Sequence, residues 1–286
     1  QHHHAHLAAC LADNQRYLTE EKVIGVIFDG TGYGTDSTIW GGEFLIGNLR
    51  GFERAYFLEP APQPGGDLAA QNPSRMALAH LWRQSLPWES SYPAVQALTS
   101  MELEVLQNQL EKSINTPLTS SMGRLFDAVS AFIGVCESVN YEAQAAIELE
   151  AIADEDEEGF YPFEITSDSA EIRLKPFWES LLDDVNMKIP RSTISARFHN
   201  SIVQLQLAIS KKLRQQTHIN TVVLSGGVWA NQYLLYRSKK VLSDNGFDVL
   251  THRRVPCNDG GIALGQLMIA AAKLPHLAKE RNKPCV

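Results

Sequence analysis

The chain has 286 residues, of which 44% are apolar and 20% charged, and its formal net charge is −8 at pH 7. This composition is that of a globular protein and excludes an intrinsically disordered chain, while the acidic balance argues against broad, non-specific binding to nucleic acid. The four cysteines form no CxxC pair, so neither a disulfide scaffold nor a cysteine zinc finger is expected, and we expect a reducing cytoplasm. No apolar run reaches membrane-spanning length, so no membrane span is expected.

The chain opens with Gln1-His2-His3-His4-Ala5-His6, which predicts a helix that binds a metal. In a helix His2 and His6 lie on one face, and two imidazoles at that spacing can hold one zinc or iron ion. A shortened purification tag is the alternative. The tag interpretation is weaker because Ala5 interrupts the histidines and residues 7–12 continue as a good helix-forming stretch.

A short apolar run at residues 23–28 predicts a buried strand that ends in a turn at Asp29-Gly30. The glycines of residues 29–36 would let backbone N–H groups reach a phosphate, and Asp29 could bind a metal or position a nucleophile. By itself this pattern is weak evidence for a phosphate or metal site, because glycine-rich strand ends are common in α/β proteins.

Residues 38–40 and 44–46 flank Gly41-Gly42-Glu43 and predict two further strands with a close backbone approach between them. A loop is expected at 60–73, which is rich in Pro, Gly and Asp, and a helix at 74–82. A helical stripe of apolar residues marks 120–133. The acidic run at 154–158 is interpreted as a solvated loop, with an interaction tail as the alternative.

The last part of the chain alternates helices and strands, which is typical of α/β architecture. A long helix is expected first, followed in order by a strand, a helix, a strand and a helix, at residues 191–216, 221–224, 231–245, 248–251 and 261–273.

Two more glycine turns follow strands in this part. Ser225-Gly226-Gly227-Val228 comes before Asn231 at a helix start, which favours an anion or nucleotide site, although it is neither GxGxxG nor a P-loop. A tight turn for helix packing is the alternative. Asp259 lies in the turn 256–262, where a helix-capping role is reasonable, but with His2, His6 and Asp29 it would complete a mixed nitrogen and oxygen ligand set.

Five stretches together carry a family resemblance. They resemble the carboxy-terminal region of the HypF family of hydrogenase maturation carbamoyltransferases, itself similar to tRNA threonylcarbamoyl transferases; these stretches are HHHAH, FDGTGYGTDSTIWGGEF, SSMGRLFDAVSAFIG, LSGGVWANQYLL and HRRVPCNDGGIALGQ. The resemblance implies a two-lobed α/β fold of the actin/hexokinase/Hsp70-like (ASKHA) nucleotide-binding class. The strands that precede the histidine helix in the family are not found, so the first lobe is expected to be incomplete at its N-terminus.

The resemblance also implies an organisation and a site. Residues 1–60 would be the remainder of the first lobe with the metal helix, 61–190 a mostly helical insert and linker, and 191–286 the second lobe. The implied metal ligands are His2, His6, Asp29 and Asp259, and the implied nucleotide contacts are Gly41, Gly42, Asp127, Gly226, Gly227 and Asn231. For His3 and His4, packing or support of the ligands is as reasonable as ligation.

The function implied is transfer of the carbamoyl group of carbamoyl adenylate, made upstream from carbamoyl phosphate and ATP, to the C-terminal cysteine of HypE. The thiocarboxamide formed there becomes the cyanide ligand of [NiFe]-hydrogenase. The acylphosphatase-like, zinc-finger and adenylate-forming domains of HypF proteins have no counterpart in this sequence. Two alternatives stay open: a nucleotide-gated binding module without transfer chemistry, and a tRNA-modifying relative.

Overall fold

The computed structural model describes residues 1–166 and 168–281. A mixed sheet with the strand order β6-β7-β3-β2-β1-β8-β9 runs through the molecule; β5 also pairs with β2, and β4 pairs with β5. The strands are β1 (Val23–Tyr33), β2 (Ile39–Gly47), β3 (Phe52–Leu58), β4 (Ala61–Pro62), β5 (Leu118–Thr119), β6 (Glu164–Ile165), β7 (Glu171–Arg173), β8 (Thr221–Ser225) and β9 (Asp248–Leu250).

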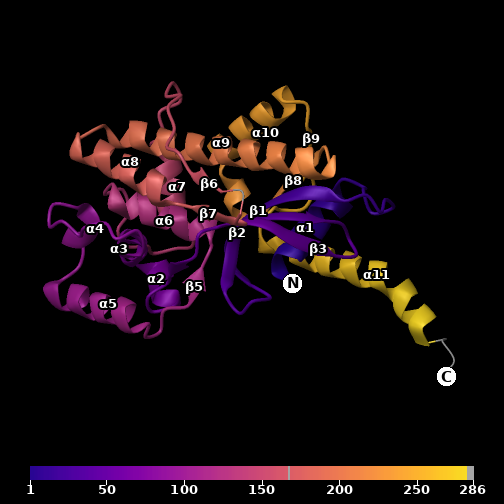
Figure 1. The fold of residues 1–286 in the computed structure, drawn as a ribbon, viewed down its shortest axis with the longest axis horizontal. Coiled ribbons are helices and arrows are strands. Elements are labelled where there is room, and N and C mark those ends of the chain that lie inside the picture. The colour runs from indigo at the N-terminus through magenta and orange to yellow at the C-terminus, as the bar shows by residue number, and fades with distance from the viewer. Residues whose placement is uncertain (167, 282–286) are drawn as a thin grey trace.

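Helices cover both faces of this sheet (Figure 1). They are α1 (His2–Asp13), α2 (Asp67–Gln71), α3 (Pro73–Arg83), α4 (Pro93–Gln96), α5 (Ser100–Lys112), α6 (Met122–Phe132), α7 (Gln144–Ala151), α8 (Lys175–Asn186), α9 (Arg191–Thr217), α10 (Gln232–Asp244) and α11 (Ile262–Arg281), with short 3₁₀ turns η1 (Gly227–Ala230) and η2 (Asp259–Gly261). The helix predicted at 120–133 and the whole alternation after residue 190 are therefore confirmed.

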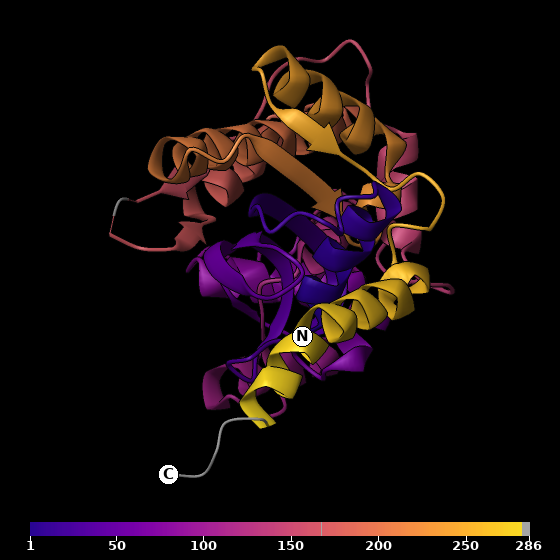
Figure 2. The same cartoon turned by 90° about the vertical axis from the view of Figure 1, so that its right-hand side faces the viewer.

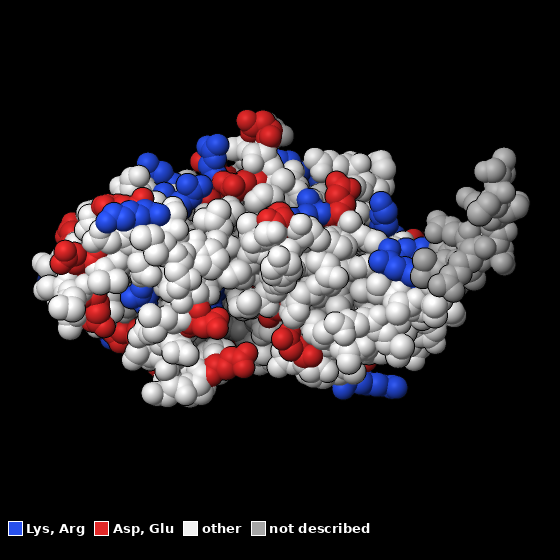
Figure 3. Space-filling view, turned by 90° about the horizontal axis from the view of Figure 1, so that it is seen from below, with Lys and Arg blue, Asp and Glu red and all other residues white. Residues whose placement is uncertain are grey.

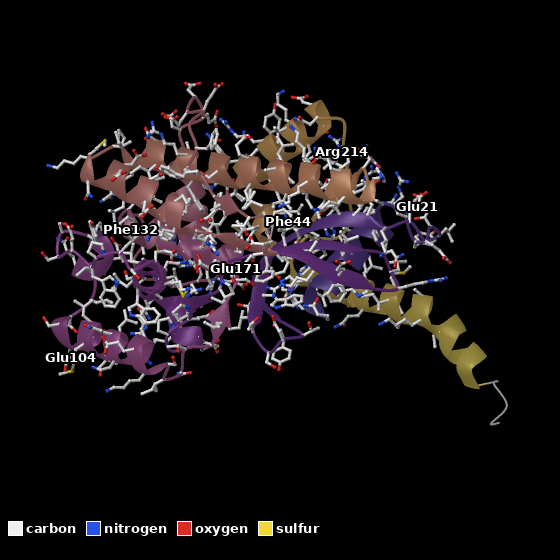
Figure 4. All side chains as sticks on the ribbon, viewed as in Figure 1. Glu21, Phe44, Glu104, Phe132, Glu171 and Arg214 are labelled. Carbon is white, nitrogen blue, oxygen red and sulfur yellow. The ribbon has the colours of Figure 1, made fainter. Side chains whose placement is uncertain are left out.

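Strand β1 lies in the middle of the sheet and explains why residues 23–28 are all apolar. Ile24, Val26 and Phe28 point into a large core cluster on one face, while Val23 and Ile27 join a second cluster on the other. A strand buried on both faces needs apolar residues at every position. Phe44 and Phe132, both fully buried, lie in the interior, whereas Glu104 and Glu21 lie at the periphery (Figure 4).

Two predictions about this part of the sheet are wrong. Asp29-Gly30 is not a turn, because β1 continues through it to Tyr33. Residues 38–40 and 44–46 are not two strands, because β2 is continuous through Gly41 and Gly42. The pairing of β1 with β2 is irregular between Phe28 and Gly32, so a β-bulge occupies the place where the sequence suggested a turn.

The segment 60–73, predicted as a loop, contains β4 and the short helix α2. The acidic residues 154–158 form no regular helix or strand, as predicted, and lie against α9 and α10 through the contacts of Asn200 with the Glu157 carbonyl and of Arg237 with the Glu155 carbonyl. The loop is thus fixed by its backbone carbonyls and by the ion pair of Glu157 with Arg197 at 3.5 Å.

The face of the sheet opposite α9 is covered by α1 and α11. Leu7, Ala8 and Leu11 of α1 belong to the second core cluster, with Met268 and Ile269 of α11 packed against it. The N-terminus lies against α11 in both views, although the two helices come from opposite ends of the chain (Figures 1 and 2). Gly265 permits this contact, because a Cβ there would collide with the carbonyl oxygen of Ala5.

Residues 1–60 and 191–286, which we expected in different lobes, contribute strands to the same sheet: β1 pairs in parallel with β8. The division into lobes at residues 60 and 190 stays a prediction. No helix among the described residues combines the length and the apolar composition needed to cross a bilayer. Acidic and basic side chains are interspersed on the face seen in Figure 3, which presents no continuous basic surface. Cys285 lies outside the described residues.

Candidate metal and nucleotide site

The four predicted metal ligands converge on one point. The side chains of His2 and His6 from α1, Asp29 from β1 and Asp259 from η2 each offer one ligand atom, and these atoms all lie within 4.8 Å of one another. The helix places the two imidazoles on one face, with their Nε2 atoms 3.2 Å apart. The structure thus brings the four residues together, and their binding of a metal stays a prediction.

Their spacing fits a bound metal ion. Nε2 of His2 and Nε2 of His6 lie 3.0 and 2.9 Å from Oδ2 of Asp29, and 3.2 and 3.4 Å from Oδ1 of Asp259. Ligands bound at about 2.0–2.2 Å from one ion lie about 3.0–3.5 Å from each other in tetrahedral or octahedral geometry. Two histidines and two carboxylates are a donor set suited to zinc or iron.

The Asp29 carboxylate is oriented by backbone groups. Its Oδ1 accepts hydrogen bonds from the N–H of Gly30 at 2.9 Å and of Gly227 at 3.0 Å, which leaves Oδ2 to face the histidines. The β-bulge after Phe28 creates this arrangement. Gly41 lies opposite the bulge, and a Cβ at that position would collide with the carbonyl oxygen of Asp29 and lie 3.0 Å from Oγ of Ser121. Ser121 in turn donates to the Asp29 carbonyl at 2.8 Å.

The carboxylate and the imidazoles of the four-residue cluster shift each other's pKa values. Burial would raise the pKa of Asp29, but hydrogen bonds from His2 and His6 outweigh it and hold that pKa well below its usual range. The hydrogen bond to Asp29 raises the pKa of His2. Asp29 is therefore ionised at any physiological pH, which is the form that binds a metal, whereas His2 must be neutral to do so.

One side of the cluster is open to solvent. The side chain of His6 is 1% exposed and that of Asp29 10%, whereas the side chain of Asp259 is 73% exposed. A small substrate could therefore reach the cluster from the side of Asp259 and His2 without any movement of the buried ligands.

His3 and His4 do not belong to the cluster. The ring of His3 lies behind His2, with its Nε2 3.8 Å from Oε2 of Glu43, and burial lowers the pKa of His3 to about 3. His4 turns the other way, with Nε2 2.7 Å from the carbonyl oxygen of Asn48 and its ring against Phe52. Of the two roles left open for these residues, packing is the one observed.

The turn after β8 adjoins the metal cluster. Gly226 has φ +107°, and a Cβ there would collide with the carbonyl oxygen of Phe28. Gly227 donates its N–H to Asp29, as described above. Asn231 caps α10 by accepting from the N–H of Leu234 at 2.8 Å, and its amide nitrogen lies 3.0 Å from Nε2 of His199. The tight-turn interpretation is thus realised, and the nucleotide contacts of these residues stay predictions. The capping role considered for Asp259 falls instead to Asn258, whose side chain accepts from the N–H of Gly260 at 3.1 Å.

The other predicted nucleotide contacts come from β2 and α6. Gly41 and Gly42 are buried within β2, where their missing side chains accommodate the backbone of Asp29 and Ser120. Asp127 lies on α6, 2.8 Å from Arg124, and burial raises its pKa to about 6 while Arg124 opposes the shift. With Arg124 and Tyr141 it lines a cavity of about 500 Å³, large enough for part of a nucleotide.

Sequence reasoning missed a buried charged network beside the cluster. Glu43 is completely buried and its carboxylate bonds the guanidinium of Arg54 at 2.7 Å, the hydroxyl of Ser120 at 2.5 Å and the N–H of Gly41 at 2.5 Å. Arg54 stacks on Trp40 and Phe57, with its Cζ 4.0 and 3.8 Å from the ring centroids. The Trp-Gly-Gly-Glu run was the available signal, because a glutamate inside an apolar strand needs a buried partner.

Comparisons with known proteins agree with this geometry. The family model described as "Carbamoyltransferase, Kae1-like Domain, second subdomain" matches residues 25–266. The carbamoyltransferase HypF of Rhodobacter capsulatus is 38% identical over 275 residues, which are 96% of this chain and 36% of that protein. A HypF homolog of Cupriavidus necator is 35% identical over 301 residues, covering all of this chain and 75% of that protein.

A solved structure of full-length HypF in the phosphate- and nucleotide-bound form superposes with a TM-score of 0.88 at 42% identity, covering 96% of this chain and 42% of that one. The likeness confirms the expected ASKHA-like α/β fold. The chain spans little more than a third of the length of most of the HypF relatives that it matches. From the matched family model, the relatives and the shared fold, we conclude that the chain belongs to the carbamoyltransferase HypF family.

Proposed function

We propose that this chain is the carbamoyl-transfer module of a HypF protein and passes the carbamoyl group of carbamoyl adenylate to the C-terminal cysteine of HypE, in the synthesis of the cyanide ligand of [NiFe]-hydrogenase. The observation that carries the proposal is the convergence of His2, His6, Asp29 and Asp259 on one point with an open side. Membership of the HypF family supplies the class of reaction.

In this proposal the four residues hold a divalent zinc or iron ion, which supplies Lewis acidity toward the carbamoyl carbonyl or the phosphate. The residues of the chain orient it: Gly30 and Gly227 fix the Asp29 carboxylate, and α1 fixes both imidazoles. The exposed side of Asp259 leaves room for the substrate.

The transfer itself forms one bond and breaks one. The thiolate sulfur of the partner's cysteine attacks the carbamoyl carbon, a carbon–sulfur bond forms, the bond from that carbon to the phosphate oxygen breaks, and AMP leaves with the electron pair. The nucleophile belongs to the partner, so no cysteine of this chain has to react. Cys10, Cys136 and Cys257 are free thiols, as suits a reducing cytoplasm.

We further propose that an adenine nucleotide lies with its phosphates against the turn at Gly226 and Gly227 and its ribose near Asp127, with Gly41, Gly42 and Asn231 shaping the surroundings. The cavity beside Asp127 supports the ribose position, and the strand–glycine–helix order of β8, η1 and α10 supports the phosphate position. Calorimetric titration with ATP should show binding to the wild type and none to Gly227→Val. Equal affinities would contradict the phosphate position.

The test of the transfer reaction supplies synthetic carbamoyl adenylate and a HypE tail peptide to the metal-loaded chain and follows the peptide mass. A carbamoylated cysteine is expected, and a peptide ending in serine should stay unmodified. Nucleotide binding without transfer would instead support the nucleotide-gated binding module. The tRNA-modifying alternative is not proposed, because the chain belongs to the HypF family.

The same assay with carbamoyl phosphate and ATP in place of the adenylate should give no product. No segment of this sequence resembles the adenylate-forming domain that the reaction needs upstream, and adding that domain should restore transfer. A carbamoyl adduct made by residues 1–286 alone would contradict this part of the proposal.

A further inference from the structure

We propose that Asp13 and His252 are positioning residues for the metal centre. They hold the loop that leads to Asp259 in a fixed position relative to the helix that bears His6. The inference rests on the proposed metal site and concerns two residues outside the ligand set. Asp13 is the last residue of α1, and His252 lies in the segment 251–258, which connects β9 to η2 and thus leads to Asp259.

Asp259 needs such support because its own side chain has little. Among the described residues, its only close polar contacts are with the imidazoles of His2 and His6, and it is 73% exposed. Asp29, in contrast, is held by two backbone N–H groups. The position of Asp259 therefore depends on the loop that precedes it.

Asp13 connects that loop to α1, the helix that carries His2 and His6. Its Oδ2 accepts hydrogen bonds from the N–H groups of Arg253 at 2.5 Å and Arg254 at 3.0 Å, and the Asp13 side chain is 3% exposed. Hydrogen bonds from backbone N–H groups to a buried carboxylate are stronger than neutral ones. The carboxylate thus joins the helix of His2 and His6 directly to the loop of Asp259.

His252 provides the second link. Its Nε2 lies 2.8 Å from Oγ of Ser225, and Ser225, which is completely buried, donates its hydroxyl to the carbonyl oxygen of His6 at 3.0 Å. Because the serine hydrogen is directed to His6, Nε2–H of His252 is the donor to Ser225. Nδ1 of the same ring lies 3.9 Å from Oδ2 of Asp13, so the two links lie side by side without a hydrogen bond between them.

A nearby contact offers a matched control. Arg16, just after α1, pairs with Asp248 in β9 at 3.1 Å, and both side chains are about half exposed. This ion pair joins the region after α1 to β9, but it does not touch the loop 251–258. Such surface pairs contribute little to stability, so Arg16→Ala should leave metal binding unchanged.

The experiment measures Zn²⁺ affinity by calorimetry on chelator-treated full chain and records the absorption spectrum of the Co²⁺-loaded protein. Loss of support around a metal ligand typically weakens binding about 10- to 100-fold. Asp13→Ala should weaken Zn²⁺ binding by that factor and alter the Co²⁺ bands, while Asp13→Asn, whose amide oxygen still accepts from the loop, should restore most of the affinity. His252→Ala should weaken binding, and His252→Gln, which can still donate to Ser225, should restore it.

The outcomes separate the alternatives. If Asp13→Asn binds as weakly as Asp13→Ala, the lost charge rather than position is responsible and the inference is wrong. If both alanine variants keep wild-type affinity and spectrum, it is also wrong, although the metal site stands. Wild-type protein that binds no Zn²⁺ would overturn both. Should Asp13→Ala not fold, as judged by circular dichroism, the Asp13→Asn and His252 variants decide alone.

Discussion

The N–H of Gly227 donates to one oxygen of Asp29, at 3.0 Å, while the other oxygen of the same carboxylate faces the two histidines. The glycine turn after β8 therefore supports a candidate metal ligand and is also a candidate phosphate site. A ligand that moves this turn would also move Asp29. The following predictions test the arrangement around it.

Removing both helical imidazoles should abolish metal binding. In His2→Ala/His6→Ala only Asp29 and Asp259 remain, and two carboxylates on a solvent-open surface hold zinc or iron poorly. Elemental analysis after dialysis should show loss of the metal found in the wild type. The exposed His218, at the end of α9, serves as control, and His218→Asn should keep its metal. Undiminished metal in the double variant would contradict the assignment.

Gly226→Ala should destabilise the fold more than Gly246→Ala. Both glycines have positive φ, +107° and +79°, a conformation that costs other residues about 1–3 kcal/mol. A Cβ at Gly246 meets nothing within 4 Å, whereas one at Gly226 collides with the carbonyl of Phe28. Denaturant unfolding of the two variants measures the difference, and equal losses of unfolding free energy would argue against the prediction.

Glu43→Ala should be strongly destabilising, because it leaves the largely buried guanidinium of Arg54 paired only with Asp36, whose side chain is 44% exposed. Breaking a buried ion pair by removing one member costs about 3–5 kcal/mol. Glu53→Ala, at an exposed position of β3, is the control and should change the free energy of unfolding by less than about 0.5 kcal/mol. A small effect of Glu43→Ala in urea denaturation would show that the network is dispensable.

Acid should destabilise the protein partly through His80. Burial lowers the pKa of His80 to about 3, and its ring stacks on Trp178. Between pH 6.5 and pH 3, His80 is protonated in the unfolded chain but stays neutral in the folded protein. The free energy of unfolding therefore falls as the pH falls from 6.5 toward 3. In His80→Phe this slope should be smaller by roughly 1 kcal/mol per pH unit. Parallel pH profiles of the two proteins would contradict the prediction.

Much of the site could be predicted because its residues follow local rules. The spacing of His2 and His6 fixes their common face in any helix, and the glycine turn at Gly226 and Gly227 follows the end of β8 as predicted. The bulge at Asp29 could not be predicted, because Asp and Gly are rare in strands. Only the pairing with β2, itself interrupted by Gly41 and Gly42, keeps this segment extended.

The contacts that support the site could not be predicted from the sequence for a different reason. Asp13 and Arg253 are 240 positions apart, and no local pattern connects an acidic residue at a helix end with a distant backbone N–H. Glu43 and Arg54 are closer in sequence, but Gly41 and Gly42 suggested a break between two strands rather than one continuous buried strand. Contacts of this kind become visible only when the sheet is assembled.

The contact between α1 and α11 has a consequence for biosynthesis. The ribosome makes His2, His6 and Asp29 before it makes Asp259 and the helix that covers α1. Until that later segment emerges, the two imidazoles and an apolar face of α1 lack the partners that cover them in the folded structure. The four candidate ligands therefore come together only when the segment of Asp259 and α11 docks, so the proposed metal site forms late in the folding of these residues.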